Sequence, residues 1–307
     1  MDLKAARQLK ARCAELDLHN LLCSDNQDLD LIIWCKILSG GQMKTFYLQQ
    51  MQLGVSKRDL VHSLKFRWLD HWLAPLEWLK QQALQRTRLA PEKIVPCPLG
   101  VNTEKFESLT LSQAQAREDF ALPENLFLFG FLGRTDPGKG LHTLIEAFNQ
   151  VAENDPDVGL LVVSAFPKEG GEHWEYCQKI HRQKETSPYR ERIFFRPFTD
   201  QVEKVFKCMD VFVMASVAET VGMVTIEAML SRVPVLGANQ AGTPELLDFG
   251  RVGRLFEVEN PQDLALKMRS LKEGREESLR QADQAFTRAK SLYSSDQMCH
   301  TIQRRLL

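Results

Sequence analysis

Several protein classes are excluded by what the sequence lacks. Its seven cysteines form no Cys-x-x-Cys pair and its seven histidines show no His-Glu-x-x-His spacing, so neither a zinc site nor a disulfide framework is indicated. No apolar run approaches the roughly 20 residues that span a bilayer, and the opening MDLKAARQLKARC is too charged for a secretory signal. A net charge of −1 gives no indication of nucleic-acid binding. We therefore expect a reduced, cytoplasmic protein without a metal.

The length of the chain and an alternating pattern in its second half indicate the fold. At 307 residues the chain is long for one core, which favours two domains. Helical patterns separate short apolar runs in the second half, and the clearest of them, Gly140–Val151, has one apolar face. The runs expected to form strands are Leu126–Leu132, Gly159–Ser164, Arg192–Phe195, Val211–Ala215 and Val233–Gly237. This alternation predicts an α/β fold with a parallel, doubly wound sheet and a ligand at the carboxyl ends of its strands.

The first hundred residues give weaker signals. We expect a helix over residues 1–16, strands over Leu18–Cys23 and Lys44–Gln49, an apolar element of undetermined type over Leu29–Leu38, and a long helical region over Ser56–Arg88. The last of these interleaves tryptophan with basic side chains. Such a pattern is found on membrane-surface helices, but more often on a solvated helix face, and we favour the solvated face.

The segment Val217–Leu247 carries two glutamates around an expected helix start. Glu219 falls in the loop after a strand, Gly222 frees the backbone, and Glu227 lies about a turn and a half into the helix. An open helix N-terminus attracts an anion such as phosphate, while carboxylates beside it accept hydrogen bonds from sugar hydroxyls. The pattern therefore fits a nucleotide diphosphate sugar, although two solvated glutamates near a helix start are about as common on dipole grounds alone.

A glycine-rich loop follows the first strand of the second half. It runs from Gly130 to Gly140 and contains Arg134 and Lys139, two cations suited to neutralising phosphate. The spacing is nearly that of a P-loop NTPase. A P-loop requires Ser or Thr after its lysine as a magnesium ligand, and here that residue is Gly140, which has no hydroxyl. The NTPase alternative is therefore distant.

Taken in order, these motifs resemble family-4 glycosyltransferases, the retaining group 1 enzymes with the GT-B fold. Gly133-Arg134 and Lys139-Gly140, then Glu219, Gly222 and Glu227, then Gly-Thr-Pro-Glu at 242–245 follow the order of that family. Ile94–Phe106 is similar to its inter-domain crossover. The resemblance covers roughly the last two thirds of the chain and implies two Rossmann-like domains, with the last helices crossing back to the first domain.

The resemblance also implies a site and a chemistry. Glu219, Arg134 and Lys139 would be catalytic: the two cations would stabilise the departing diphosphate, and Glu219 would hold the transferred sugar. Glu227 would hold the ribose, and the amides of the helix start would face the phosphate. The full set of expected donor-binding residues is Gly133, Arg134, Lys139, Glu219, Thr220, Val221, Gly222, Met223, Val224 and Glu227. The donor would be a UDP- or GDP-sugar and the acceptor a glycan or lipid-linked molecule, with no cofactor and no metal.

The first domain departs from the family pattern. Its opening elements look incomplete, and the family's acceptor-side histidine is replaced by Gln49-Gln50-Met51. We expect a shortened acceptor-side domain over 1–105, a nucleotide-sugar domain over 106–285 and a returning helix over 286–307. Two functions stay open: a glycosyltransferase, and a catalytically silent nucleotide-sugar-binding subunit completed by a partner chain or oligomer. Peripheral contact with the inner face of a membrane also stays open.

Overall fold

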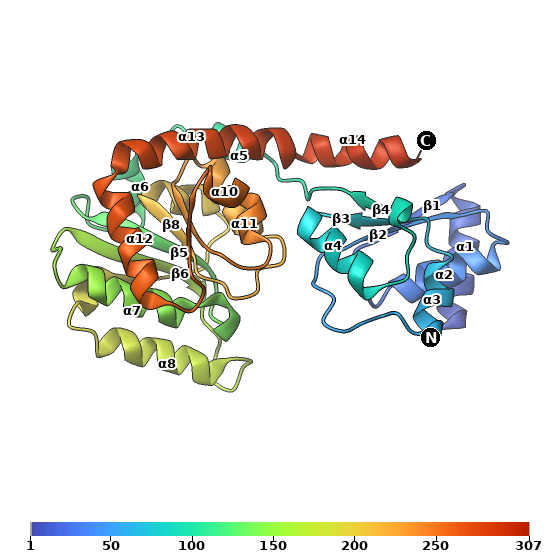
Figure 1. Ribbon diagram of the computed structural model, residues 1–307, viewed down its shortest axis with the longest axis horizontal. Helices are drawn as coiled ribbons and strands as arrows, with labels where there is room; N and C mark the ends of the chain where they lie inside the picture. Colours follow the sequence, from blue (N-terminus) through green and yellow to red (C-terminus); the bar gives the residue numbers. More distant parts are fainter. Residues whose placement is uncertain (1, 307) are drawn as a thin grey trace. The chain divides into compact units, whose positions relative to one another are not determined.

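The chain forms two compact units, which are described separately. The computed structural model describes residues 2–306, so the end residues 1 and 307 of the expected ranges lie outside it (Figure 1). Unit 1 comprises Met1–Gly100 and Ser295–Leu307, and unit 2 comprises Val101–Ser294. The units are therefore divided between residues 100 and 101 and between residues 294 and 295. The boundaries expected from the sequence lie between residues 105 and 106 and between residues 285 and 286.

Unit 1 contains a four-stranded parallel sheet in the order β1-β2-β3-β4. Its strands are β1 (Asn20–Cys23), β2 (Lys44–Leu48), β3 (His71–Ala74) and β4 (Ile94–Pro96). Its helices are α1 (Leu3–Glu15), α2 (Leu29–Leu38), α3 (Leu60–Phe66), α4 (Glu77–Arg86) and α14 (Ser295–Leu306), with a 3-10 turn η1 (Pro91–Lys93).

The expected long helix over 56–88 is wrong, because β3 interrupts it. Trp72, Leu73 and Ala74 are all fully buried, and β3 lies between β2 and β4, so three consecutive side chains face apolar surroundings on both sides of the sheet. An inner strand of a parallel sheet is covered on both faces, so it buries the side chains on both sides of the sheet. The expected strands and first helix of this unit are confirmed, and the undetermined element is α2.

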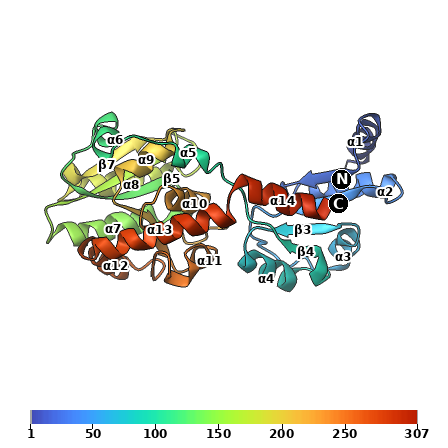
Figure 2. The same ribbon diagram turned by 90° about the horizontal axis from the view of Figure 1, so that it is seen from above.

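Helix α14 completes a small apolar core in unit 1. Met298 and Ile302 pack against a cluster on the strands, and Figure 2 shows α14 lying along them. The cluster consists of Phe46, Leu48, Leu73, Val95 and Cys97. Helix α13 ends at Leu292 and α14 begins at Ser295, so the helical tail of the chain breaks between these two residues.

Unit 2 contains a six-stranded, fully parallel sheet in the order β10-β9-β8-β5-β6-β7. Its strands are β5 (Phe127–Arg134), β6 (Val158–Ala165), β7 (Ile193–Pro197), β8 (Val211–Met214), β9 (Val235–Ala238) and β10 (Arg254–Phe256). Its longer helices are α6 (Gln113–Asp119), α7 (Leu141–Ala152), α8 (Trp174–Glu185), α9 (Val202–Cys208), α10 (Met223–Leu230), α12 (Pro261–Glu273) and α13 (Arg275–Leu292). Short turns complete it: α5 (Glu104–Glu107), η2 (Pro137–Lys139), η3 (Arg190–Arg192), α11 (Thr243–Leu246) and η4 (Asp248–Gly250).

Helices cover both faces of this sheet. Helix α7 buries an apolar stripe that includes Leu144, Ile145 and Phe148, and it shares one core with α12 and the strands. Figure 1 shows α7 and α8 on one side of the strands and α6 and α10 on the other. The predicted doubly wound α/β sheet is therefore confirmed. Sequence reasoning missed β10, a strand of only three residues.

Candidate functional site

The predicted phosphate loop and the predicted glutamate loop meet at one edge of the unit 2 sheet. The strand order reverses direction between β5 and β8, and loops leaving two such strands diverge to opposite faces and open a crevice. The loop after β5 and the loop after β8 are in direct contact here. The amide of Val217 donates to the carbonyl oxygen of Gly138 over 2.9 Å. Fold topology thus brings together two segments about 80 residues apart in the sequence.

Gly140 fits this contact because it has no side chain. Its φ of +67° is left-handed, and a Cβ built there would lie 2.1 Å from the carbonyl oxygen of Ala215. No other residue can take this conformation without moving the backbone after β8. The serine or threonine that a P-loop needs at this position therefore has no room. Two observations now oppose the NTPase alternative: the hydroxyl that would bind magnesium is missing, and the backbone leaves no space for a side chain that carries one.

Lys139 and Glu219 form an ion pair across the two loops. Lys139 Nζ lies 2.7 Å from Glu219 Oε2, and the two side chains are only 24% and 14% exposed. Partial burial strengthens the attraction, because fewer water dipoles screen it. Two side chains to which the sequence assigns separate roles, a cation for the diphosphate and a carboxylate for the sugar, thus contact each other directly.

The backbone of the Glu219 loop is held by the Gly-x-Pro-Glu segment. The amide of Gly242 donates to the Glu219 carbonyl oxygen over 3.2 Å. The side-chain amide of Gln240 donates to the Val217 carbonyl oxygen over 2.8 Å. Sequence reasoning included 242–245 in the family's motif order but missed Gln240, since no pattern distinguishes it from a solvated side chain.

Helix α10 begins beside this loop with an uncapped N-terminus. Gly222, its N-cap residue, has a φ of +74° and no side chain to cap the first amides. A Cβ at Gly222 would lie 2.8 Å from Leu246 Cδ1, so the close approach also favours glycine. The first amides of a helix have no partner within it, and here no side chain supplies one. The amides of Met223 and Val224 are therefore candidates for holding an anion.

Two threonine hydroxyls near this helix start were missed. Thr225 and Thr243 are fully buried, and neither Oγ1 has a hydrogen-bond partner among the described residues. Thr225 Oγ1 lies 3.4 Å from the position that a Gly222 Cβ would occupy. Thr225 could have been identified from the sequence by its position, because it lies three residues after Gly222, the glycine at the expected helix start.

Glu227 lies on α10 with an unpartnered carboxyl group. Burial raises its pKa from 4.5 to about 7; nearby Lys105 opposes the rise and Glu203 adds to it. Among residues 2–304, whose side chains the structure describes, no hydrogen bond or ion pair reaches this carboxyl group. A carboxyl group partly withdrawn from water without compensation is costly to ionise, and a ligand hydroxyl that donates to it would offset that cost.

The remaining predicted residues are placed as follows. Arg134 ends β5 with its side chain 77% exposed, and its guanidinium lies 3.3 Å from Asp136 Oδ2, so the structure does not join it to the Lys139–Glu219 pair. Gly133 and Thr220 are partly exposed. Val221 is 5% exposed, which leaves its backbone as the part able to face a ligand.

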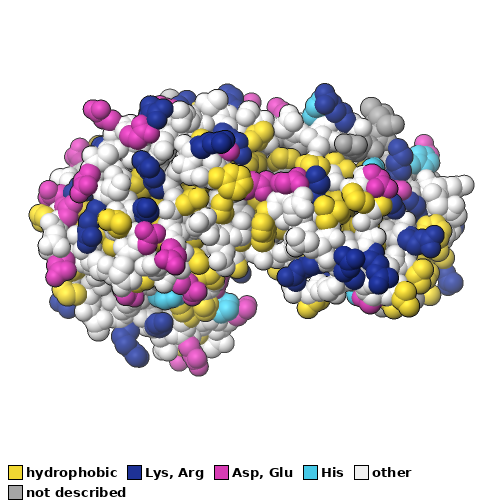
Figure 3. Space-filling model, viewed as in Figure 1, with side chains coloured by type: hydrophobic (Ala, Val, Ile, Leu, Met, Phe, Trp, Pro, Cys, Tyr) yellow, Lys and Arg dark blue, Asp and Glu magenta, His cyan; other side chains and the backbone are white. Residues whose placement is uncertain are grey.

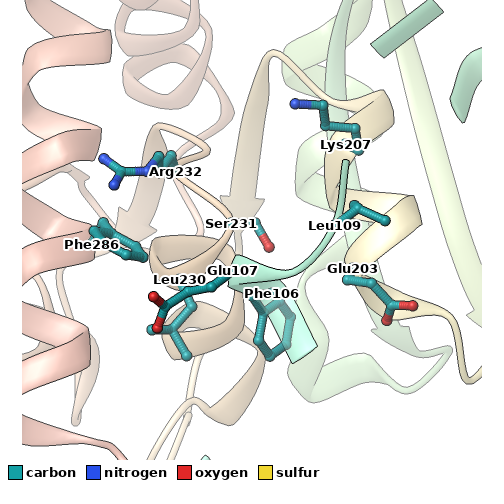
Figure 4. A pocket seen from close by; sticks show the side chains of 9 residues that line it. All are labelled: Phe106, Glu107, Leu109, Glu203, Lys207, Leu230, Ser231, Arg232 and Phe286. Atoms are coloured by element: carbon teal, nitrogen blue, oxygen red, sulfur yellow. The ribbon is translucent and has the colours of Figure 1, made fainter. Parts of the chain in front are cut away.

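A cavity of about 260 Å³ lies on unit 2 between α5, α9, α10 and α13 (Figure 4). It is lined by Phe106, Glu107, Leu109, Glu203, Lys207, Leu230, Ser231, Arg232 and Phe286. None of the predicted donor residues lines it. Its carboxylates are already paired, Glu107 with Lys290 over 2.7 Å and Glu203 with Lys105 over 3.0 Å.

Within residues 2–306, no three His, Cys, Asp or Glu side chains are grouped so as to hold a metal ion. None of the helices in that range is both long enough and apolar enough to cross a membrane.

The fold defines the class of protein. Two parallel-sheet units give the chain the GT-B fold, which it shares with solved glycosyltransferases. HepE of Anabaena, crystallised with UDP and glucose, is 20% identical with a TM-score of 0.84 over 98% of this chain and 80% of HepE. A glycosyltransferase of Rickettsia africae is 17% identical with a TM-score of 0.88 over 98% of this chain and 79% of that one.

The sequence matches the family described as glycosyl transferases group 1 over residues 112–288, and the chain belongs to this family. A D-inositol 3-phosphate glycosyltransferase of Streptomyces bingchenggensis is 27% identical over 66% of this chain and 45% of its own length. Spore coat protein SA of Bacillus subtilis is 25% identical over 64% and 53%. The chain spans about half the length of the curated relatives it matches. The predicted fold and group 1 resemblance are confirmed.

Proposed function

We propose that this chain is a retaining, metal-independent glycosyltransferase that moves a sugar from a UDP- or GDP-sugar to a glycan or lipid-linked acceptor. The observation that carries the proposal is the Lys139–Glu219 pair, 2.7 Å apart where two loops meet at the reversal of strand order. Crevices at this point of a doubly wound sheet bind nucleotides, and the group 1 family matches this unit. The crystal structure of HepE with UDP and glucose supports a UDP-sugar among the donors.

Each side chain has a role in this proposal. Lys139 leaves Glu219 for the donor diphosphate, with Arg134 turning in from solvent as a second cation. The released Glu219 carboxylate accepts hydrogen bonds from hydroxyls of the transferred sugar. Because negative charge grows on the diphosphate as the sugar departs, fixed cations stabilise the transition state more than the bound donor. No metal is needed if the two cations supply this stabilisation.

The helix start and Glu227 hold the nucleotide. The amides of Met223 and Val224 face a phosphate oxygen, where the partial positive charge of the helix end also favours an anion. The Glu227 carboxylate accepts hydrogen bonds from the two ribose hydroxyls. Ribose binding therefore supplies the partners that this carboxyl group lacks in the free protein.

The test is titration calorimetry of UDP, GDP and ATP into the purified chain, each with and without magnesium. We expect UDP or GDP to bind without magnesium and Lys139→Ala and Glu227→Ala to abolish that binding. If both variants bind like the natural chain, the site assignment is wrong. ATP binding confined to magnesium would instead favour an NTPase. Retention is tested separately by the anomeric configuration of the product in NMR spectra.

A second function is favoured by one observation in unit 1. Gln49 belongs to the segment Gln49-Gln50-Met51, which stands in place of the family's acceptor-side histidine, and its buried side chain has both ends of its amide occupied. Its Oε1 accepts from Trp72 Nε1 over 2.9 Å, and its Nε2 donates to the Met51 carbonyl oxygen over 3.0 Å. A side chain so engaged suits a catalytically silent nucleotide-sugar-binding subunit that needs a partner chain. Donor turnover by the isolated chain, faster than by Glu219→Ala, would exclude this alternative.

A further inference from the structure

Helix α3 exposes its apolar stripe to solvent. At about 100° per residue Leu60, Val61 and Leu64 fall within roughly one quadrant of the helix surface. Trp68 is exposed in the turn after the helix, while Phe66 lies on the other side of the helix and is buried. A surface helix of a globular protein normally faces its apolar stripe to the core. We name these exposed side chains the α3 face; they are between 42% and 73% exposed and comprise Leu60, Val61, Leu64 and Trp68.

The α3 face is a concentrated patch and not a scattered set of side chains. Its four members fall within nine residues, and the connection before α3 exposes Met51 and Val55 by 74% and 69%. Figure 3 shows hydrophobic side chains gathered over α3 with Lys and Arg side chains beside them. In unit 2, by contrast, exposed large apolar residues such as Leu266 and Leu279 stand singly. Single exposed apolar residues are ordinary, whereas a contiguous patch marks an interaction surface.

The rim of the α3 face is basic. The one acidic side chain between residues 56 and 68, Asp59, is engaged with α3, since it caps the helix and lies 2.6 Å from His62 Nδ1. Lys65 pairs with Asp30, but Arg58 and Arg67 have no acidic partner within residues 2–306. Two guanidinium groups without counterions therefore border the apolar stripe.

An exposed apolar stripe with a basic rim fits an anionic lipid bilayer better than it fits a second copy of the chain. Arg58 Nη1 donates to the Gln85 carbonyl oxygen over 3.1 Å, a contact that leaves its charge unneutralised. Two copies of the chain related by a two-fold axis would therefore place the same positively charged groups against each other, which disfavours self-association. An anionic bilayer accommodates every group: short apolar side chains enter the headgroup boundary, tryptophan prefers that depth, and guanidinium groups reach lipid phosphates.

We propose that the α3 face is a peripheral docking surface for membranes rich in anionic lipid. The helix lies in the plane of the interface, its apolar stripe inserts, and Arg58 and Arg67 contact the headgroups. This surface belongs to unit 1 alone and does not depend on the donor site of unit 2.

The test is co-sedimentation of the full chain with vesicles. One set is phosphatidylcholine alone, and the other is phosphatidylcholine and phosphatidylglycerol in equal parts. We expect binding to the anionic vesicles, weakened by added salt, and weak binding to the neutral ones. The double variant Val61→Ser/Leu64→Ser should lower the partition coefficient at least about tenfold, and Arg58→Gln/Arg67→Gln should remove the preference for anionic lipid.

The matched control is Leu266→Ser, which removes a leucine that is 57% exposed on α12 of unit 2. It should bind vesicles as the natural chain does. All of these side chains are exposed, so circular dichroism should show every variant folded. The proposal is overturned if the natural chain does not sediment with anionic vesicles, or if Val61→Ser/Leu64→Ser binds them undiminished. Concentration-dependent dimers that this variant abolishes, without vesicle binding, would assign the α3 face to a second copy and overturn it too.

Discussion

The protonation of Glu227 gives a quantitative test of the donor site. If ribose hydroxyls donate to the Glu227 carboxylate, the nucleotide binds the ionised form and lowers its pKa. Binding then releases a proton, and affinity rises with pH up to the pKa of the free protein, which burial raises to about 7. Such a group is about one tenth ionised at pH 6 and about nine tenths ionised at pH 8. Affinity should therefore rise about tenfold, or ~1.4 kcal/mol, over that range.

The variant Glu227→Gln isolates this effect. The ligand's own phosphate titrates near pH 6, but it does so identically for both proteins. The ratio of natural to Glu227→Gln affinity, measured by calorimetry with UDP and with GDP, should therefore rise about tenfold between about pH 6 and about pH 8. A ratio that stays flat would refute the assignment of the ribose to Glu227.

A ligand-free measurement checks the same raised pKa. The folded pKa of about 7 lies above the 4.5 of an unperturbed glutamate, so the folded state binds the proton more tightly than the unfolded state. The free energy of unfolding of the natural chain should therefore fall as pH rises from about 4.5 to about 7, by at most ~3 kcal/mol. Glu227→Gln should lack this loss. Denaturant unfolding at about pH 5 and pH 8 measures the difference, and equal pH dependence of the two proteins would contradict it.

Three further predictions concern the loops and α10. Lys139→Met should weaken nucleotide binding. In denaturant unfolding, the losses of stability caused by Lys139→Met and by Glu219→Gln should be less than additive in the double variant, because the two side chains form one ion pair. Fully additive losses would contradict the ion pair. Gly140→Ala should destabilise the chain by about 3 kcal/mol or more because of its clash, whereas Gly138→Ala, at an ordinary φ, should cost at most about 1 kcal/mol; similar melting temperatures would contradict this. Arg232→Ala should be less stable than Arg232→Gly by about 1 kcal/mol, because position 232 has a φ of +56°; the reverse order would contradict this.

The parts of unit 2 that were predicted correctly have local causes. The apolar face of α7 repeats at helical spacing, and buried parallel strands such as β6 are continuous apolar runs, so the pattern specifies the element. Segment order then identified the loops after β5 and β8. Strand β10 escaped because three residues carry too little pattern, and its position is set by pairing with β9.

The errors came where tertiary contacts decide the outcome. In HWLAPLEW nothing local distinguishes an inner strand from a helix turn, and only burial between β2 and β4 selects β3. The ion pair of Lys139 with Glu219 could not be predicted, because it depends on two loops meeting across the sheet. The direction of the Arg134 side chain could not be predicted either; it is 77% exposed, and its guanidinium lies 3.3 Å from Asp136 Oδ2.

The packing of α14 against the strands of unit 1 has a consequence for the order of folding on the ribosome. Unit 2 is continuous from Val101 to Ser294, so all of it is synthesised before Ser295. Unit 1 must wait for α14 to bring Met298 and Ile302 to its core, although its four strands are made first. The nascent amino-terminal sheet therefore remains partly uncovered, with apolar surface open to chaperones, while nearly 200 further residues are added.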